Sequence, residues 1–209
     1  MEVDVLRQLL LVASRRSVLR QYRYHKLDKE RMSEAEIRHV TAKVLEEKRI
    51  YYGIEIPTRE DYVHEDKHVT RKALVDLVIY EKKESEHPSV FIEFKRGQPE
   101  IEKIKKDFNK MMREPSSLEG ACFYHILRKS DYGSDNRLSR ARSNILKKYS
   151  DALKDVHHTH RFNNQVLSNR WFLLFVLDGS NRQYNSCAVG NMCLAFDCPE
   201  DWKDIRAAR

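Results

Sequence analysis

Long hydrophobic runs are missing from the sequence, and its first residues do not have the pattern of a secretory leader. No stretch of the 209 residues reaches the roughly 18 apolar residues that a membrane-spanning helix needs. Residues 1–5 contain two acids and lack the positively charged start of a signal peptide. We therefore predict a cytoplasmic protein without a membrane segment.

Cysteine is scarce, and its spacing excludes a familiar class of metal site. The cysteines are Cys122, Cys187, Cys193 and Cys198, and no two of them have the C-x-x-C spacing of a structural zinc site. Because we predict a cytoplasmic protein, we expect these thiols to be reduced.

Charge of one sign is in modest excess. The chain has 39 Lys and Arg residues against 32 Asp and Glu, a net charge of +7. This balance favours a polyanionic partner such as nucleic acid or an anionic membrane surface, although a generally basic protein would show it too. The length suits one domain, and we predict a nuclease-like domain over residues 33–209 preceded by a basic helical extension over residues 1–32.

Charged residues interrupt two short apolar runs, residues 73–80 and 89–97, which predict adjacent β-strands. Asp76 lies in the first run, and Glu93 and Lys95 lie in the second. A lone carboxylate buried in a strand is costly, so these charges need a partner or a metal ion.

The spacing of these residues predicts a single site. Glu93 and Lys95 are two residues apart and point to the same face of a strand. If the two strands pair, Asp76 lies beside Glu93. Carboxylate oxygens suit Mg²⁺ or Mn²⁺, which can activate water while a lysine orients it or neutralises developing charge. The alternative is an edge strand with an exposed Glu–Lys pair.

The sequence Val75-Asp76, followed by Glu93-Phe94-Lys95, resembles the PD-(D/E)xK nuclease superfamily, with Val75 in place of the usual proline. The resemblance covers roughly residues 33–127. It implies an α/β, restriction-endonuclease-like fold, in which a mixed central sheet is flanked by helices. It further implies that Asp76, Glu93 and the backbone carbonyl of Phe94 bind Mg²⁺ or Mn²⁺, and that Asp76, Glu93 and Lys95 are catalytic.

A third acid is expected from a helix before the motif. Residues 33–48 predict this helix, with Ser33 and Glu36 forming a capping box. Residues 33–37 are similar to a segment in the nuclease domain of type I restriction subunits, which implies Glu34 as a further catalytic acid and metal ligand, with Glu36 next. Acids also suit the first turn of any helix. Glu55, in a predicted strand over residues 50–57, is another candidate.

The remaining elements complete the expected order. We predict helices over residues 3–24, 99–113 and 137–156, strands over 121–127 and 171–177 and around 187–196, and a charged loop over 59–71. In the helix over 99–113, the apolar stripe leaves four lysines for solvent or phosphates: Lys103, Lys105, Lys106 and Lys110.

The helix over 137–156 lies in the most basic long segment of the chain. We expect its cations to contact the backbone of a nucleic acid. They are Arg137, Arg140, Arg142, Lys147 and Lys148. The basic N-terminal helix is a second candidate for phosphate contacts, or for the interface of a homodimer.

These observations favour a metal-dependent endonuclease that hydrolyses phosphodiester bonds in DNA, in restriction, phage defence or repair. RNA is not excluded as a substrate. One alternative is a non-catalytic nucleic-acid-binding or scaffolding module on the same fold. Another is an interaction module of unrelated α/β fold with an accidental motif, in which Asp76, Glu93 and Lys95 would diverge.

Overall fold

The protein, described here by a computed structural model, is defined over residues 1–24, 32–64, 69–114, 118–134, 137–160, 170–189, 196 and 201–207. Its helices are α1 (Val3–Tyr24), α2 (Glu34–Glu47), α3 (Ile101–Arg113), α4 (Lys129–Tyr132) and α5 (Leu138–His160). Its strands are β1 (Tyr52–His64), β2 (Val69–Ile79), β3 (Val90–Arg96), β4 (Gly120–Leu127), β5 (Trp171–Asp178), β6 (Gln183–Val189) and β7 (Lys203–Asp204).

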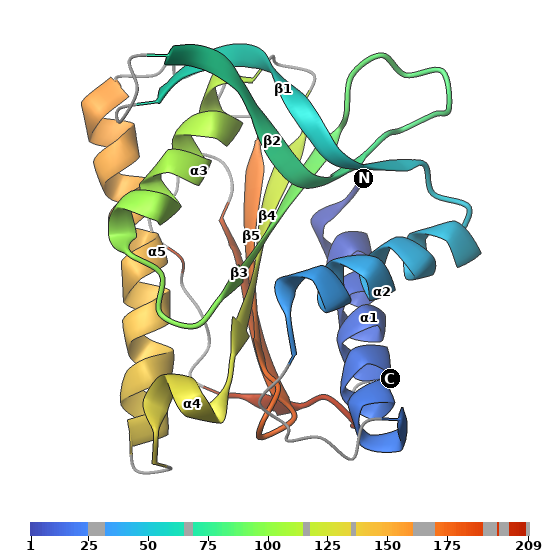
Figure 1. Ribbon diagram of the computed structural model, residues 1–209, viewed down its shortest axis with the longest axis vertical. Helices are drawn as coiled ribbons and strands as arrows, with labels where there is room; N and C mark the ends of the chain where they lie inside the picture. The colour runs from blue at the N-terminus through green and yellow to red at the C-terminus, as the bar shows by residue number, and fades with distance from the viewer. Residues whose placement is uncertain are drawn as a thin grey trace.

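The strands form one mixed sheet in sequence order, β1 to β7 (Figure 1). Only β3, β4 and β5 are parallel neighbours, and the other pairs are antiparallel. This follows from the connections, because parallel strands need a long crossover and α3 and α5 supply the two crossovers. The predicted α/β fold with a mixed sheet flanked by helices is confirmed.

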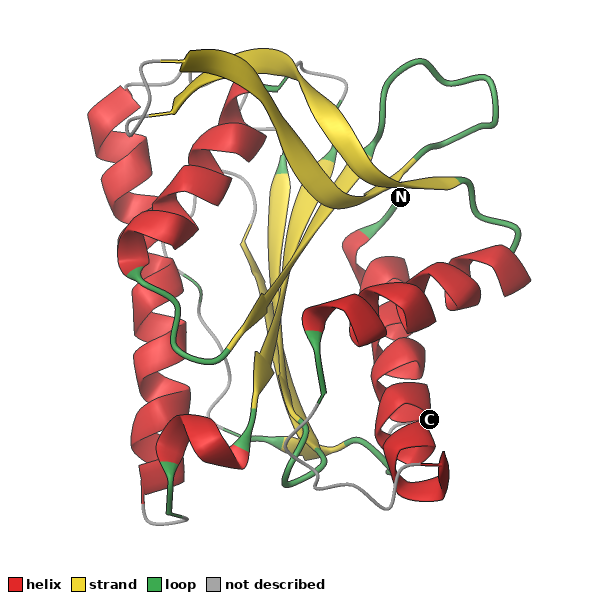
Figure 2. Cartoon of the chain, in the orientation of Figure 1, coloured by secondary structure: helices red, strands yellow, loops and turns green. Residues whose placement is uncertain are grey.

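Helices cover both faces of the sheet (Figure 2). The sheet and its two helical layers bury two apolar cores, one with α1 and α2 and the other with α3 and α5. The central strands β4 and β5 are almost entirely buried, as expected of parallel strands covered on both faces. The region predicted as an extension, residues 1–32, contains α1, whose leucines Leu6 and Leu10 are buried in the same core as β4 and β5.

Local sequence explains where the site-bearing helices begin and end. Ser33 is the N-cap of α2, and its Oγ accepts the Glu36 N–H at 3.1 Å, as the capping pattern predicts. The end of α3 is held by the buried Arg170. Its guanidinium donates to the carbonyls of Met111, Glu114 and Leu118, which satisfies one backbone group in the last turn of the helix and two beyond it.

Two sequence-based boundaries are wrong. The expected loop over 59–71 contains strand residues at both ends, because β1 runs to His64 and β2 begins at Val69. Tyr62 on β1 and Arg71 on β2 are antiparallel partners. This pairing forms a strand in a region whose charged sequence does not predict one. The last strand, expected around 187–196, is β6 at Gln183–Val189, and most of residues 190–200 lie outside the described part.

The cysteines do not all match the expectation of reduced thiols. Cys122 on β4 is free and buried, but Cys187 on β6 is disulfide-bonded. Cys193 and Cys198 lie outside the described residues. None of the described helices combines the length and apolar character needed to cross a membrane.

Candidate functional site

The site begins where the sheet opens between β2 and β3. Their pairing runs from Ile79 opposite Val90 to Leu77 opposite Ile92 and stops there. Asp76, the next residue of β2, places Oδ2 2.8 Å from the backbone N of Phe94 and accepts its hydrogen bond. The carboxylate therefore replaces the partner strand at the opened edge of β3.

The opened edge presents further backbone groups. The N–H and C=O of one strand residue point to the same side, so the Phe94 carbonyl faces the same opening as its N–H. Arg96 has the same orientation two residues later, and its backbone hydrogen-bonds the carboxylate of Glu34 at the start of α2. Asp76 and Glu34 thus meet successive exposed backbone positions of β3.

A change of strand face accompanies this opening. Leu77 and Ile79 are buried in the core under α1 and α2, whereas Val78 and Val75 are buried in the core under α3 and α5. Regular alternation would place Val75 with Leu77, so the pattern slips by one residue at Asp76. On the neighbouring strand, Glu55 has a positive φ of 53°, which is unusual for a residue other than glycine.

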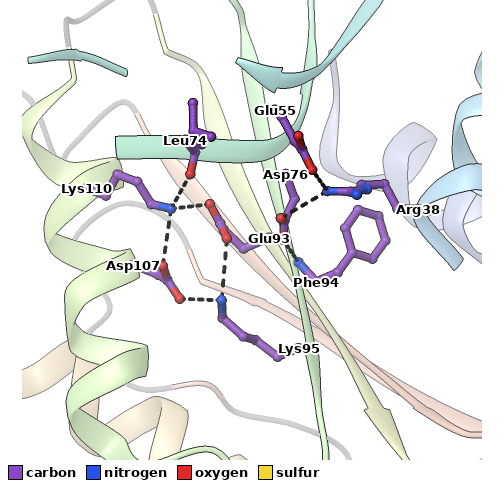
Figure 3. A network of polar contacts seen from close by, with 9 residues as sticks. All are labelled: Arg38, Glu55, Leu74, Asp76, Glu93, Phe94, Lys95, Asp107 and Lys110. Atoms are coloured by element: carbon purple, nitrogen blue, oxygen red, sulfur yellow. Dashed lines mark hydrogen bonds and ion pairs between the residues drawn. The ribbon is translucent and has the colours of Figure 1, made fainter. Parts of the chain in front are cut away.

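Arg38 links the outer acids. Its Nη1 lies 3.1 Å from Glu55 Oε1 and 3.5 Å from Asp76 Oδ1 (Figure 3). The Glu55 carboxylate is exposed, while that of Asp76 is only partly accessible. Arg38 therefore partly neutralises Asp76 without enclosing it.

Behind Asp76 lies a network of two acids and two lysines. Glu93 on β3 is buried, and its two oxygens face different ammonium groups: Oε1 accepts from Lys110, and Oε2 lies 3.5 Å from Lys95 Nζ. Asp107 on α3 joins both lysines, at 2.8 Å from Lys95 and 3.2 Å from Lys110. Figure 3 shows these four side chains converging between β3 and α3.

Lys95 is held in its charged form. Burial alone would lower the pKa of this ammonium, but the carboxylates of Asp107 and Glu93 outweigh burial and raise it above the ordinary lysine value. The sequence could not decide between these opposing effects. The geometry favours a permanent cation at this position and disfavours a general base.

Glu93 and Lys110 form a tightly coupled pair. Burial and nearby Asp107 raise the pKa of Glu93, and Lys110 and Lys95 oppose this effect. Burial would lower the pKa of Lys110, but Glu93 and Asp107 raise it above its usual value. Because two ammonium groups face the buried carboxylate, charge pairing compensates for part of its desolvation.

Glu34 completes the outer part of the site. Glu34 is exposed as a whole residue, but partial burial of its carboxyl group raises the pKa of that group. The charge of Lys95 opposes this increase, and the charge of Asp76 adds to it. Glu34 and Lys95 both line a pocket of about 420 Å³ at the end of β3. The rest of the lining is largely polar: Arg96, Gln98, Pro99, Glu100 and Lys103.

The structure therefore brings together the four residues proposed for catalysis, Asp76, Glu93, Lys95 and Glu34. Their charges act on one another directly across α2, β2 and β3. Of the other candidate acids, Glu55 reaches Asp76 through Arg38. Glu36 donates its backbone N–H to the Ser33 cap.

Sequence reasoning missed Asp107, Lys110 and Arg38. Lys110 was expected to be available to solvent or phosphates, and this is wrong because its side chain is only 7% exposed. A signal was present for Asp107, because it lies three residues after Ile104 and four before Met111, within the apolar stripe of α3. A charged residue in such a stripe needs a buried partner.

The predicted phosphate contacts, which lie on α5 or immediately before it, fall into two groups. Arg137, Arg140 and Lys147 are exposed. Arg142 instead contacts Asp178, Gln183 and the ring of Trp202. Lys148 donates to the Pro99 carbonyl at 3.0 Å, so the middle of α5 reaches the pocket rim.

A buried histidine supports the loop after Lys95. His125 Nε2 lies 2.9 Å from the Gly97 carbonyl, and Nδ1 lies 3.1 Å from Tyr149 Oη. A carbonyl only accepts, so Nε2 carries the proton and Nδ1 accepts from Tyr149 in a neutral ring. Burial lowers the pKa of His125 to about 4, despite the opposing hydrogen bond to Gly97.

We expect His125 to make the protein less stable in acid. The unfolded chain binds a proton on this histidine below about pH 6.5, whereas the folded chain resists it down to about pH 4. The free energy of unfolding therefore has its full value above about pH 6.5. It falls by up to about 3 kcal/mol as the pH drops from there to about 4. Urea unfolding at pH 7 and pH 4 would show wild type losing this advantage over His125→Gln.

The matched control for this measurement is His87→Gln. His87 is exposed, with Nε2 3.1 Å from Arg59 Nη1. Because this side chain lies at the surface, its replacement is expected to change the free energy of unfolding by less than about 0.5 kcal/mol at either pH. An identical pH dependence in wild type and His125→Gln would show that His125 is not buried in its neutral form.

The donor set suits a magnesium-type ion that retains water. Among the described residues, no three His, Cys, Asp or Glu side chains are arranged as a ready-made metal cage. Mg²⁺ is commonly bound by only one or two protein carboxylates, together with waters and substrate phosphates. The carboxylates of Asp76 and Glu34 and the Phe94 carbonyl fit that requirement, while both Glu93 oxygens already face lysines.

Comparisons with protein-family models, with curated proteins and with solved structures found no match to this chain.

Proposed function

We propose that this protein is a metal-dependent endonuclease that hydrolyses phosphodiester bonds in DNA. The observation that carries the proposal is the opened edge of β3, where Asp76, Glu34 and the Phe94 carbonyl lie beside the protonated Lys95. If β2 continued to pair with β3 beyond Leu77, its backbone hydrogen bonds would occupy this edge. Its opening exposes oxygen donors and a fixed cation at one end of a polar pocket.

Asp76, Glu34 and the Phe94 carbonyl would hold Mg²⁺ or Mn²⁺ in this proposal, with the Glu93 carboxylate directly behind them. A divalent ion held there would activate water and stabilise charge on the phosphate. The Phe94 N–H fixes the orientation of Asp76. Asp107 orients the Lys95 ammonium, which keeps its proton and favours negative charge developing at the pocket.

The surroundings support a polyanionic substrate. Arg96 and Lys103 line the pocket, and Lys148 contacts its rim through Pro99. The exposed cations of α5, including Lys147, extend this positive charge along a helix. Such an arrangement suits successive phosphates of a nucleic acid. A cytoplasmic location and a homodimer that cuts two strands belong to the same proposal.

The test is cleavage of plasmid and single-stranded DNA by the purified protein with Mg²⁺ or Mn²⁺, with EDTA as a control. We expect cutting that needs the metal and falls at least about 10²-fold in Asp76→Asn, because a metal ligand is lost. DNA affinity should not fall in this variant, since it removes a negative charge. Equal cutting by wild type and Asp76→Asn would contradict the assignment.

A non-catalytic nucleic-acid-binding module on the same fold is the second candidate. The observation that favours it is the pairing of both Glu93 oxygens with lysines, which occupies one of the acids of the motif. The same experiment distinguishes the two. Salt-sensitive DNA binding by wild type, without cutting under any metal condition, would support the binding module.

A further inference from the structure

The Lys110 ammonium occupies a position with the surroundings of a metal ion. Three oxygens from three elements converge on its Nζ: Glu93 Oε1 from β3, Asp107 Oδ1 from α3 at 3.2 Å and the Leu74 carbonyl from β2 at 2.9 Å. Two are carboxylate oxygens and one is a backbone carbonyl, the donor types that divalent ions use in proteins. The Lys110 side chain is almost completely shielded from solvent.

This cation lies on the opposite side of Glu93 from the open part of the site. Figure 3 shows Lys110 reaching Glu93 from α3, while Asp76 lies toward Arg38 and Phe94. Lys95 approaches the other Glu93 oxygen. The inner acids, Glu93 and Asp107, are thus balanced by two lysines, and the outer acid Asp76 is left for the metal.

A divalent ion bound by Glu93 would have to compete with this arrangement. It would displace a buried ammonium from its carboxylate or lie close to it, and two such cations repel strongly where water is excluded. Displacement would also break the hydrogen bond to the Leu74 carbonyl. Asp76 also faces a cation, but Arg38 lies 3.5 Å from its Oδ1, is shared with the exposed Glu55 and leaves the Asp76 side chain 29% exposed. A metal ion at Asp76 would therefore meet a weaker barrier than one at Glu93.

We propose that the Lys110 ammonium takes the place of a second divalent ion at Glu93, so that the chain binds a single divalent ion on the Asp76 side. This inference rests on the proposed metal-dependent function and specifies its metal requirement. Glu93 then acts through charge, by holding Lys95 and Lys110 in place. It is a positioning residue and does not bind the metal.

The test is Mn²⁺ binding to the full chain without DNA, measured by isothermal titration calorimetry and by the signal of free Mn²⁺ in electron paramagnetic resonance. Wild type is expected to bind one Mn²⁺. Asp76→Asn should weaken binding by about 10- to 100-fold, whereas Glu93→Gln should change it by less than about 3-fold. Two bound ions in wild type, or equal losses in both variants, would overturn the inference alone.

Lys110→Met supplies the converse experiment, with Lys110→Arg as its matched control. Removing the ammonium should create a second Mn²⁺ site that is lost again when Glu93→Gln is added, while Lys110→Arg keeps one. A folded Lys110→Met chain that binds only one ion would overturn the inference. If Lys110→Met does not fold, the comparison of Glu93→Gln with Asp76→Asn decides. Wild type that binds no Mn²⁺ would overturn the proposed function as well.

Discussion

Replacing Lys95 with methionine is expected to slow metal-dependent DNA cleavage by about 10²- to 10³-fold. This is the usual effect of removing one protein group that stabilises the charge of a transition state. The lysine lies between the buried acids and the pocket, and it is held as a cation by Asp107 and Glu93. Methionine keeps the length of the side chain but removes the charge. Single-turnover cleavage rates would measure the loss, with thermal unfolding as a check on the fold.

Lys103→Met is the matched control for this prediction. Lys103 lines the same pocket but is largely exposed, and its carboxylate partner Glu100 lies 3.5 Å away at the surface. Its loss should weaken DNA binding slightly and leave the cleavage step almost unchanged. Lys95→Arg, which keeps the charge in a different shape, should retain part of the rate. Full activity in Lys95→Met would exclude an electrostatic role for Lys95.

The protonation of Lys95 also shapes the expected pH dependence. Its pKa is raised above the ordinary lysine value, so the cleavage rate should show no deprotonation of this group through the neutral and mildly alkaline range. A group acting as a general base would instead gain activity as it lost its proton. The pH profile therefore tests whether Lys95 acts through charge.

Among the substitutions named above, Lys110→Met is expected to cause the largest loss of stability, about 3–5 kcal/mol in the free energy of unfolding. Removing one partner of a buried ion pair leaves the other charge uncompensated, which is more costly than losing an exposed pair. Glu93 and Asp107 both depend on this ammonium, and the Leu74 carbonyl loses its donor. Urea unfolding followed by circular dichroism would measure the change.

Two further variants decide whether the loss comes from the buried pair. Lys103→Met, on the exposed side of the same helix, should change stability by less than about 0.5 kcal/mol. Adding Glu93→Gln to Lys110→Met should recover part of the loss, since a neutral amide no longer leaves a buried charge. Strictly additive losses in the double variant would show that Glu93 and Lys110 are not coupled.

Much of the architecture was predictable because it depends on local patterns. The apolar runs around Asp76 and Glu93 indicated two strands, and the stripe containing Ile104 and Phe108 indicated a helix. The strand over residues 59–64 was missed because its charged residues have low strand propensity, and pairing with β2 overrides that propensity. Pairing partners are distant in sequence, so no local pattern reports them.

Some residues of the candidate site could be identified from the sequence, and others only from the structure. Its motif residues Asp76, Glu93 and Lys95, together with Glu34, were identifiable because charge inside an apolar strand or in the first turn of a helix stands out from its surroundings. Arg38 and Lys110 were not identified, since single basic residues on charged helices look alike in sequence. Only the packing of α2 and α3 on the two faces of the sheet shows that Arg38 and Lys110 meet the strand acids.

The sequence by itself determined that the chain forms an α/β fold and that acids and a lysine interrupt two neighbouring strands. These features follow from the periodicity and chemistry of adjacent residues. Only the tertiary structure decided that β2 leaves β3 at Asp76, that two lysines hold Glu93 and that Lys95 stays protonated. Each of these depends on distances between residues far apart in the chain, because burial and the balance of charges are set by what packs around a group.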